Sequence, residues 1–143
     1  MDDNLRREII LDNYKDPFHK GLVDDKSYSK INSRSESCID NLDFMMKINN
    51  NIIEDIRFDG EACAISTSAS SILIRKMIGM NVDDAKKLLE NYRNMIDEKE
   101  FDEDLLGELN AYLDIGKQPN RKNCALLPSD AIDKLMGELD NGK

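Results

Sequence analysis

Apolar positions recur with two different periods along the chain, and the change of period separates helices from strands. Residues 4–16 repeat apolar side chains every three to four positions, which predicts an amphipathic helix. Its expected apolar side consists of Leu5, Ile9, Ile10 and Tyr14. The helix should stop at Asp16, because the residue before a proline is pushed out of the α region. The following turn holds the only histidine, His19, which we expect to be a solvated turn residue rather than a ligand.

Three short runs with strand character come next. Residues 27–34 form a weak, polar run, whereas 42–48 alternate apolar and polar side chains in the period of a half-buried strand. Three asparagines at 49–51 predict a turn, and residues 52–58 form the third run. Strands this close in sequence should pair as an antiparallel meander.

Helical spacing returns at Ala64 and continues to about Gly79. Asn81 has the features of an N-cap for a second helix, whose apolar stripe runs to Ile96. The acidic run 97–104 should be solvated loop rather than a docking site, and a short helix is expected over residues 105–113. After a break at 116–119, Pro128 indicates that the last helix starts near residue 128. The fold class is therefore α+β: a three-stranded antiparallel sheet with helices packed on one face, in one domain over residues 1–143.

Composition narrows the classes of function. The 143 residues carry a formal net charge of −9, which argues against nucleic-acid binding because such proteins need a basic surface. No apolar run approaches a membrane span and the first residues lack the apolar region of a leader, so we expect a cytoplasmic protein with no membrane partner. Its three cysteines should then stay reduced, as metal ligands, nucleophiles or small buried residues.

The cysteines and one aspartate form a candidate site. Cys63 follows the third strand and precedes a helix, where the helix dipole favours a thiolate. Cys38 and Asp40 are two residues apart, so an extended segment would point both side chains to one side. If Cys124 joins them, three thiolates and a carboxylate suit tetrahedral zinc or an iron–sulfur cluster with one oxygen ligand.

Four ordered motifs resemble the iron–sulfur assembly proteins of the IscU/NifU N-terminal type, over about residues 5–136. They are LDNYKDPFHKG at 11–21, CID at 38–40, FDGEACAIS at 58–66 and RKNCA at 121–125. The resemblance implies a fold like that of SufE and NifU. It also implies a metal site made by Cys38, Asp40, Cys63 and Cys124, with Arg121 close to it.

Two features resemble the SufU branch of that family. Asn123 stands where IscU-type scaffolds have a histidine, and the interval between the second and third cysteines is longer, with residues 97–116 as the expected helical insert. This branch implies a zinc-dependent, sulfurtransferase-type acceptor in iron–sulfur cluster assembly. Cys38 would receive sulfur as a persulfide from a SufS-type cysteine desulfurase and pass it to iron–sulfur acceptor or assembly proteins.

Departures from the family pattern keep two alternatives open. Ile39 replaces the glycine of the family motif, Asn123 replaces a lysine usual in the SufU branch, and Pro128 falls where the family's last helix is already running. The first alternative is a scaffold on which a [2Fe–2S] cluster is assembled and transferred. The second is a divergent module whose zinc is purely structural.

Overall fold

The computed structural model of the chain describes residues 1–35 and 39–141. The elements are, in order, α1 (Asp3–Lys15), β1 (Ser29–Arg34), β2 (Asn41–Asn49), β3 (Ile52–Glu61), α2 (Ala64–Met77), α3 (Val82–Ile96), α4 (Glu103–Leu106), the 3₁₀ turns η1 (Gly107–Tyr112) and η2 (Ile115–Lys117), and α5 (Pro119–Asn141). None of the helices in the described residues is both long enough and apolar enough to cross a membrane.

The three strands form an antiparallel meander in the order β1-β2-β3, as the sequence predicts. Phe44 of β2 lies opposite Ile31 of β1 and Phe58 of β3, so large apolar side chains share one face. Asn50 and Asn51 turn the chain between β2 and β3 with φ of 52° and 66°, a conformation that asparagine tolerates better than most residues.

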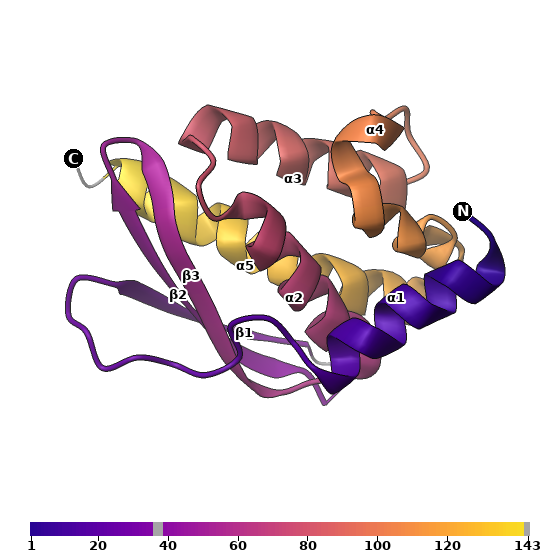
Figure 1. The fold of residues 1–143 in the computed structure, drawn as a ribbon, viewed down its shortest axis with the longest axis horizontal. Helices are drawn as coiled ribbons and strands as arrows, with labels where there is room; N and C mark the ends of the chain where they lie inside the picture. The colour runs from indigo at the N-terminus through magenta and orange to yellow at the C-terminus, as the bar shows by residue number, and fades with distance from the viewer. Residues whose placement is uncertain (36–38, 142–143) are drawn as a thin grey trace.

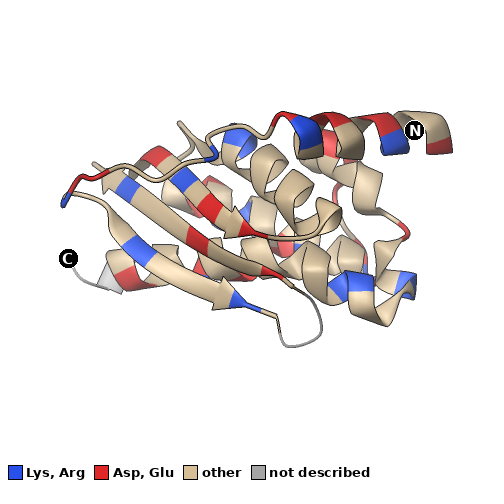
Figure 2. Cartoon of the chain, turned by 90° about the horizontal axis from the view of Figure 1, so that it is seen from below, with Lys and Arg blue, Asp and Glu red and all other residues tan. Residues whose placement is uncertain are grey.

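Helices cover one face of this sheet. Figure 1 shows α2 and α5 next to the strands and α3 on the far side of these helices from the sheet. In Figure 2 the strands lie in front and the helices behind, so the opposite sheet face looks outward. Buried side chains of β2 and β3 meet those of the helices in one core, which confirms the predicted α+β architecture. The largest fully buried apolar members are Tyr92, Tyr112, Phe44, Phe58, Leu42, Met46, Ile53, Ile56, Ile72, Leu73, Ile74 and Met77.

A close approach of β2 and β3 fixes the geometry next to the candidate site. Gly60 has a φ of +129°, and a Cβ at this position would lie 2.2 Å from the carbonyl oxygen of Asn41. Only glycine fits such a backbone without displacing the neighbouring strand. The contact holds the end of β3, which leads to Cys63, against the start of β2, which follows Asp40.

The helix N-termini behave as the sequence predicts. Cys63 is the N-cap of α2, and its Sγ accepts from the N–H of Ser66 at 3.5 Å. Asn81 is the N-cap of α3, and its side chain accepts from the N–H of Asp84 at 2.8 Å.

The predicted start of the last helix near residue 128 is wrong. α5 begins at Pro119, and Pro128 lies inside it. Proline at 119 costs no hydrogen bond, because the first N–H groups of a helix have no partner within it. Pro128 removes the N–H that would bond to the carbonyl of Cys124, and the hydroxyl of Ser66, 2.8 Å from that carbonyl, can donate to it instead. A side chain from another helix thus replaces the missing donor.

Two smaller predictions are also corrected. Leu5 and Tyr14 are 44% and 45% exposed, and the buried residue of α1 is instead Asn13, whose side chain accepts from Ser71 of α2 at 2.7 Å. The short helix expected at 105–113 is α4 followed by the 3₁₀ turn η1. The acidic run before it is mostly exposed, as expected, and α4 begins within its last two residues.

The outer face of the sheet carries a polar cluster that ties the loop after α1 to β3. Asp55 accepts from the hydroxyl of Tyr28 at 2.6 Å and from Nε of Arg57 at 3.2 Å, and Nδ1 of His19 lies 3.0 Å from it. Because His19 is half-buried in this cluster, the expectation of a solvated turn residue holds only in part.

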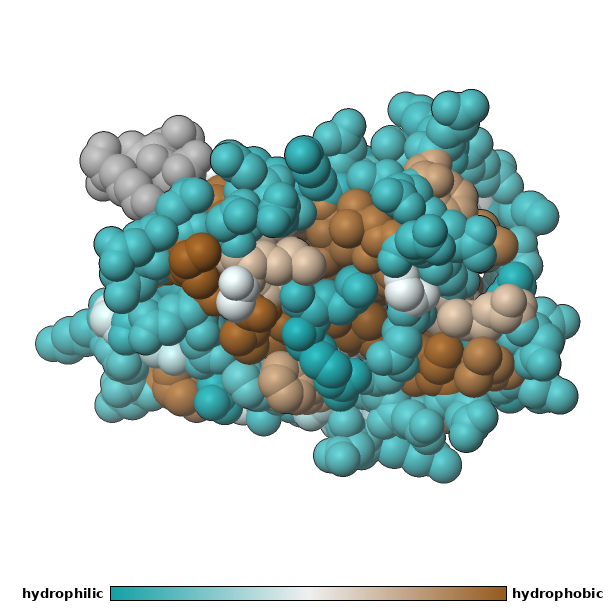
Figure 3. All heavy atoms as spheres, turned by 45° about the horizontal axis from the view of Figure 1, so that its top comes forward, coloured by the Kyte–Doolittle hydropathy of each residue, from teal (hydrophilic) through white to brown (hydrophobic). Residues whose placement is uncertain are grey.

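On the opposite side of the molecule, polar side chains cover most of the view in Figure 3, with apolar atoms visible between them.

Candidate metal centre

Three residues from distant parts of the sequence meet at one point. Asp40 directly precedes β2, Cys63 caps α2, and Cys124 lies in the second turn of α5. One ligand atom from each, a carboxylate oxygen or a sulfur, lies within 4.8 Å of the other two. Asp40 and Cys124 are buried, and Cys63 is partly exposed. The structure therefore brings together three of the four predicted ligand residues.

The chain itself holds Asp40 in place. Its Oδ1 accepts from the N–H of Cys63 at 2.7 Å, and its Oδ2 accepts from the hydroxyl of Ser66 at 2.5 Å. A carboxylate that is only 2% exposed needs such donors, because burial removes its hydration.

The three side chains fit a tetrahedral zinc ion. Bond lengths of about 2.0–2.3 Å place neighbouring ligand atoms roughly 3.3–3.8 Å apart. The separation of Cys63 Sγ from Asp40 Oδ2 is 3.8 Å, close to this spacing. Two sulfurs with one carboxylate oxygen also match the ligand types that zinc prefers.

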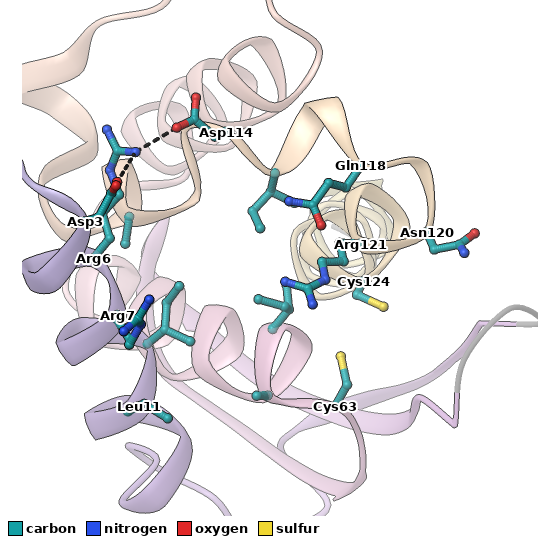
Figure 4. A pocket seen from close by; sticks show the side chains of 15 residues that line it. Asp3, Arg6, Arg7, Leu11, Cys63, Asp114, Gln118, Asn120, Arg121 and Cys124 are labelled. Atoms are coloured by element: carbon teal, nitrogen blue, oxygen red, sulfur yellow. Dashed lines mark hydrogen bonds and ion pairs between the residues drawn. The ribbon is translucent and has the colours of Figure 1, made fainter.

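A cleft of about 680 Å³ opens beside the sulfurs. Figure 4 shows the sulfurs of Cys63 and Cys124 facing one another at its edge. Arg121 of α5 and Arg7 of α1 also line the cleft, together with Asp3 and with Arg6, which pairs with Asp114 at 2.7 Å. Arg121 thus lies near the cluster, where the motif resemblance puts it. Arg121 lies three residues before Cys124, and its guanidinium group would attract a thiolate or another anionic group there.

The other predicted residues have different positions. Cys38 lies outside the described residues. Ile39 is 73% exposed, so the side chain that replaces the family's glycine points to solvent and does not fill the site. Asn123 is exposed on the first turns of α5. His19 belongs to the cluster on the outer sheet face and is not part of the metal cluster.

Sequence reasoning missed Ser66 as a functional residue. It is fully buried, and its hydroxyl or N–H contacts each of Asp40, Cys63 and Cys124. Its position three residues after the N-cap predicts a contact with Cys63, but its contacts with the other two residues depend on the tertiary fold. Serine in a helix is more often a solvated or locally bonded residue.

Comparison with known proteins identifies the family. Residues 5–134 match the sequence model described as the NifU-like N terminal domain. The chain belongs to this family. It is 31% identical over 141 residues to the zinc-dependent sulfurtransferase SufU of Bacillus subtilis, an alignment that covers 98% of this chain and 95% of that protein.

Scaffold proteins and solved structures agree with this placement. The chain is 28% identical over 132 residues to the iron–sulfur cluster assembly scaffold protein IscU of Thermotoga maritima, covering 92% of each chain. The crystal structure of FiSufU from Fervidobacterium islandicum superposes with a TM-score of 0.80 at 27% identity, covering 95% of this chain and 99% of that one. The fold predicted from the motifs is therefore confirmed.

Proposed function

We propose that this protein is a zinc-dependent sulfur acceptor in iron–sulfur cluster assembly, which takes persulfide sulfur from a cysteine desulfurase. The observation that carries the proposal is the meeting of Asp40, Cys63 and Cys124 within 4.8 Å beside a cleft that Arg121 lines. The similarity to a zinc-dependent sulfurtransferase, which covers 98% of this chain, also supports the proposal.

In this proposal Asp40, Cys63 and Cys124 bind the zinc together with Cys38, which is two residues from Asp40 in the chain. Zinc, when bound, keeps its sulfur ligands as thiolates at neutral pH, and thiolate is the form that attacks another sulfur. The chain's own residues contribute further: the N-terminus of α2 faces Cys63, and Arg121 brings positive charge to the cleft where the sulfur would arrive.

The transfer needs no external oxidant or reductant. The thiolate of Cys38 attacks the outer sulfur of the desulfurase persulfide, and a new S–S bond forms on Cys38. The S–S bond of the desulfurase breaks, its cysteine leaves as a thiolate, and the transferred sulfur keeps its proton or releases it to water. The sulfur then passes from Cys38 to an acceptor thiol by the same type of exchange.

Further parts of the proposal concern partners and organisation. The sulfur donor is a SufS-type cysteine desulfurase, and the products go to iron–sulfur acceptor or assembly proteins in the cytoplasm. Residues 1–143 form a single domain, in which residues 97–116 are a helical insert specific to the SufU branch. The contact of Asp97 with Lys122 of α5 at 2.8 Å is consistent with an insert that supports the helix carrying Cys124.

The experiment is sulfur transfer from ³⁵S-cysteine through a SufS-type desulfurase to the protein, with bound metal measured in the same samples. We expect about one zinc per chain and a reducible ³⁵S label on the protein, and no label on Cys38→Ser. Ser70→Ala serves as the control, because Ser70 is buried in α2 and its hydroxyl, among the described residues, donates to the carbonyl of Ser66 in the same helix. Equal labelling of Cys38→Ser and the unaltered chain would contradict the proposal.

The same samples test the alternatives. Iron with visible absorption after anaerobic reconstitution, without zinc, would favour a scaffold for a [2Fe–2S] cluster. Bound zinc without any transfer of label would indicate a structural zinc module.

A further inference from the structure

Ser66 has an unusual position among the residues around the metal centre. Its side chain is fully buried, and its hydroxyl oxygen lies 2.5 Å from Oδ2 of Asp40, 2.8 Å from the carbonyl oxygen of Cys124 and 3.7 Å from Sγ of Cys63. Its backbone N–H also donates to Sγ of Cys63 at 3.5 Å. One residue therefore contacts all three described ligand residues.

The hydroxyl cannot satisfy both oxygen neighbours at once. A serine hydroxyl has a single hydrogen to donate, whereas the Asp40 carboxylate and the Cys124 carbonyl are both acceptors. Donation to Asp40 holds Oδ2 toward α2. If Oδ2 bonds to a metal instead, the hydroxyl hydrogen can rotate to the Cys124 carbonyl, so neither position leaves the buried hydroxyl without an acceptor.

Pro128 keeps that second acceptor available. In an uninterrupted helix the N–H of residue 128 would bond to the carbonyl of Cys124. Proline has no N–H, and the carbonyl is open to a donor from α2. The next carbonyl of α5, that of Ala125, similarly accepts from a side chain, the hydroxyl of Tyr92 at 2.8 Å. The proline therefore removes one hydrogen bond within α5, and the carbonyl that loses this bond belongs to a ligand residue, Cys124.

We propose that Ser66 is a positioning residue of the metal centre, whose hydroxyl alternates between the Asp40 carboxylate and the Cys124 carbonyl that Pro128 leaves open. The inference rests on the proposed metal site and adds the residue that sets its geometry. Ser66 orients Asp40 and fixes the backbone of Cys124 relative to α2. Contacts to ligand residues of this kind commonly change metal affinity by about 10- to 100-fold.

The test compares Ser66→Ala with Ser70→Ala. Both serines are fully buried on α2 and four residues apart, but the hydroxyl of Ser70 donates to the carbonyl of Ser66 and bonds to none of the three described ligand residues. Zinc affinity is measured by competition with a chromogenic chelator, and site geometry by the visible absorption of the cobalt(II)-substituted protein. Unfolding of the metal-free chains is followed by circular dichroism.

We expect Ser66→Ala to bind zinc about 10- to 100-fold more weakly than the unaltered chain and to shift the cobalt bands. Ser70→Ala should keep both the affinity and the spectrum. Equal zinc affinity and an unchanged cobalt spectrum in Ser66→Ala would overturn the inference. A metal-free Ser66→Ala chain that is unfolded, while Ser70→Ala is folded, would also overturn it, because the hydroxyl would then stabilise the fold and not the ligands. Failure of the unaltered chain to bind zinc would instead contradict the proposed function.

Discussion

The backbone N–H of Cys63 donates to the carboxylate of Asp40 at 2.7 Å, so one proposed ligand residue positions another. The contact joins the start of β2 to the N-terminus of α2 across 23 residues of sequence. It depends on the fold and not on any feature of the local sequence. The acceptor end of the contact, the Asp40 side chain, can be tested by substitution.

Asp40→Asn should weaken zinc binding and destabilise the metal-free protein. The amide has one acceptor oxygen where the carboxylate has two, so one of the bonds accepted from Cys63 and Ser66 is lost and the other is no longer charge-assisted, which should cost about 1–3 kcal/mol. Loss of the charged oxygen should lower zinc affinity by about 100-fold or more. Chelator competition and urea unfolding measure the two effects. Asp43→Asn, on the outer face of the same sheet, is the control, and an Asp40→Asn chain with the control's zinc affinity would exclude Asp40 as a ligand.

Gly60→Ala should be strongly destabilising. A methyl group at this position would lie 2.2 Å from the carbonyl oxygen of Asn41, and the φ of +129° is itself unfavourable for alanine. We expect a loss of about 3 kcal/mol or more in the free energy of unfolding, measured with urea.

Gly79→Ala separates the two causes of this loss. Gly79 has a φ of +92°, but apart from its neighbours in the chain no atom of the described residues lies within 4 Å of an added methyl, so backbone strain alone should cost about 1–2 kcal/mol. Equal losses in the two variants would show that the contact with Asn41 does not constrain the sheet.

The Tyr28–Asp55 pair should make stability depend on pH at both ends of the range. The hydrogen bond to Asp55, with burial and the negative charge of Asp55, raises the pKa of Tyr28 to about 12. Partial burial raises the pKa of Asp55, but hydrogen bonds from Tyr28 and Arg57 and the positive charges of His19 and Arg57 outweigh it and leave the pKa below its usual value.

Each of these pKa shifts makes the stability of the fold depend on pH in a different range. The raised pKa of Tyr28 contributes stability that is complete below the ordinary tyrosine value of about 10 and is lost as the pH rises through about 12. The lowered pKa of Asp55 contributes stability that is present above its ordinary value and is lost as the pH falls through its value in the folded state.

Urea unfolding of the unaltered chain and Tyr28→Phe measures this contribution. The difference should be about 1–2 kcal/mol at neutral pH and should shrink between about pH 10 and 12. Asp55→Asn should remove the corresponding loss at acid pH. A constant difference between Tyr28→Phe and the unaltered chain across the alkaline range would rule out the coupling.

Local sequence rules predicted the parts of the fold that depend on near neighbours. The caps at Cys63 and Asn81 and the alternation in β2 follow from side chains within a few residues. The rule for Pro128 failed because it considers only the helix, whereas Ser66 of α2 and Tyr92 of α3 supply donors to carbonyls of α5. The rule takes the hydrogen bond that a proline lacks as a sign that the helix ends. Here contacts from other helices replace that hydrogen bond, and the helix continues.

The residues of the candidate site also include some that the sequence predicted and one, Ser66, that it did not. The motif resemblance predicted that Asp40, Cys63 and Cys124 meet. The spacing of Ser66 from the N-cap indicates its contact with Cys63 alone, and its contacts with Asp40 and Cys124 join segments 26 and 58 residues away. The apolar pattern of α1 also failed to predict which residues are buried, since Leu5 is exposed and Asn13 is buried. The reason is that α1 packs on α2 through the hydrogen-bonded side chain of Asn13. The assignment of residues 97–116 as an insert stays a prediction.

The two buried tyrosines give the site a natural optical reporter. The chain has four tyrosines and no tryptophan, so its intrinsic fluorescence is tyrosine emission alone. The hydroxyl of Tyr92 donates to the carbonyl of Ala125, next to Cys124, and the hydroxyl of Tyr112 bonds to Ser68, five residues after Cys63 in α2. The two rings lie edge to face with centroids 6.2 Å apart. A displacement of Cys124 or of α2 would alter these hydrogen bonds, so ligand exchange at the site can be followed in real time without attaching a dye.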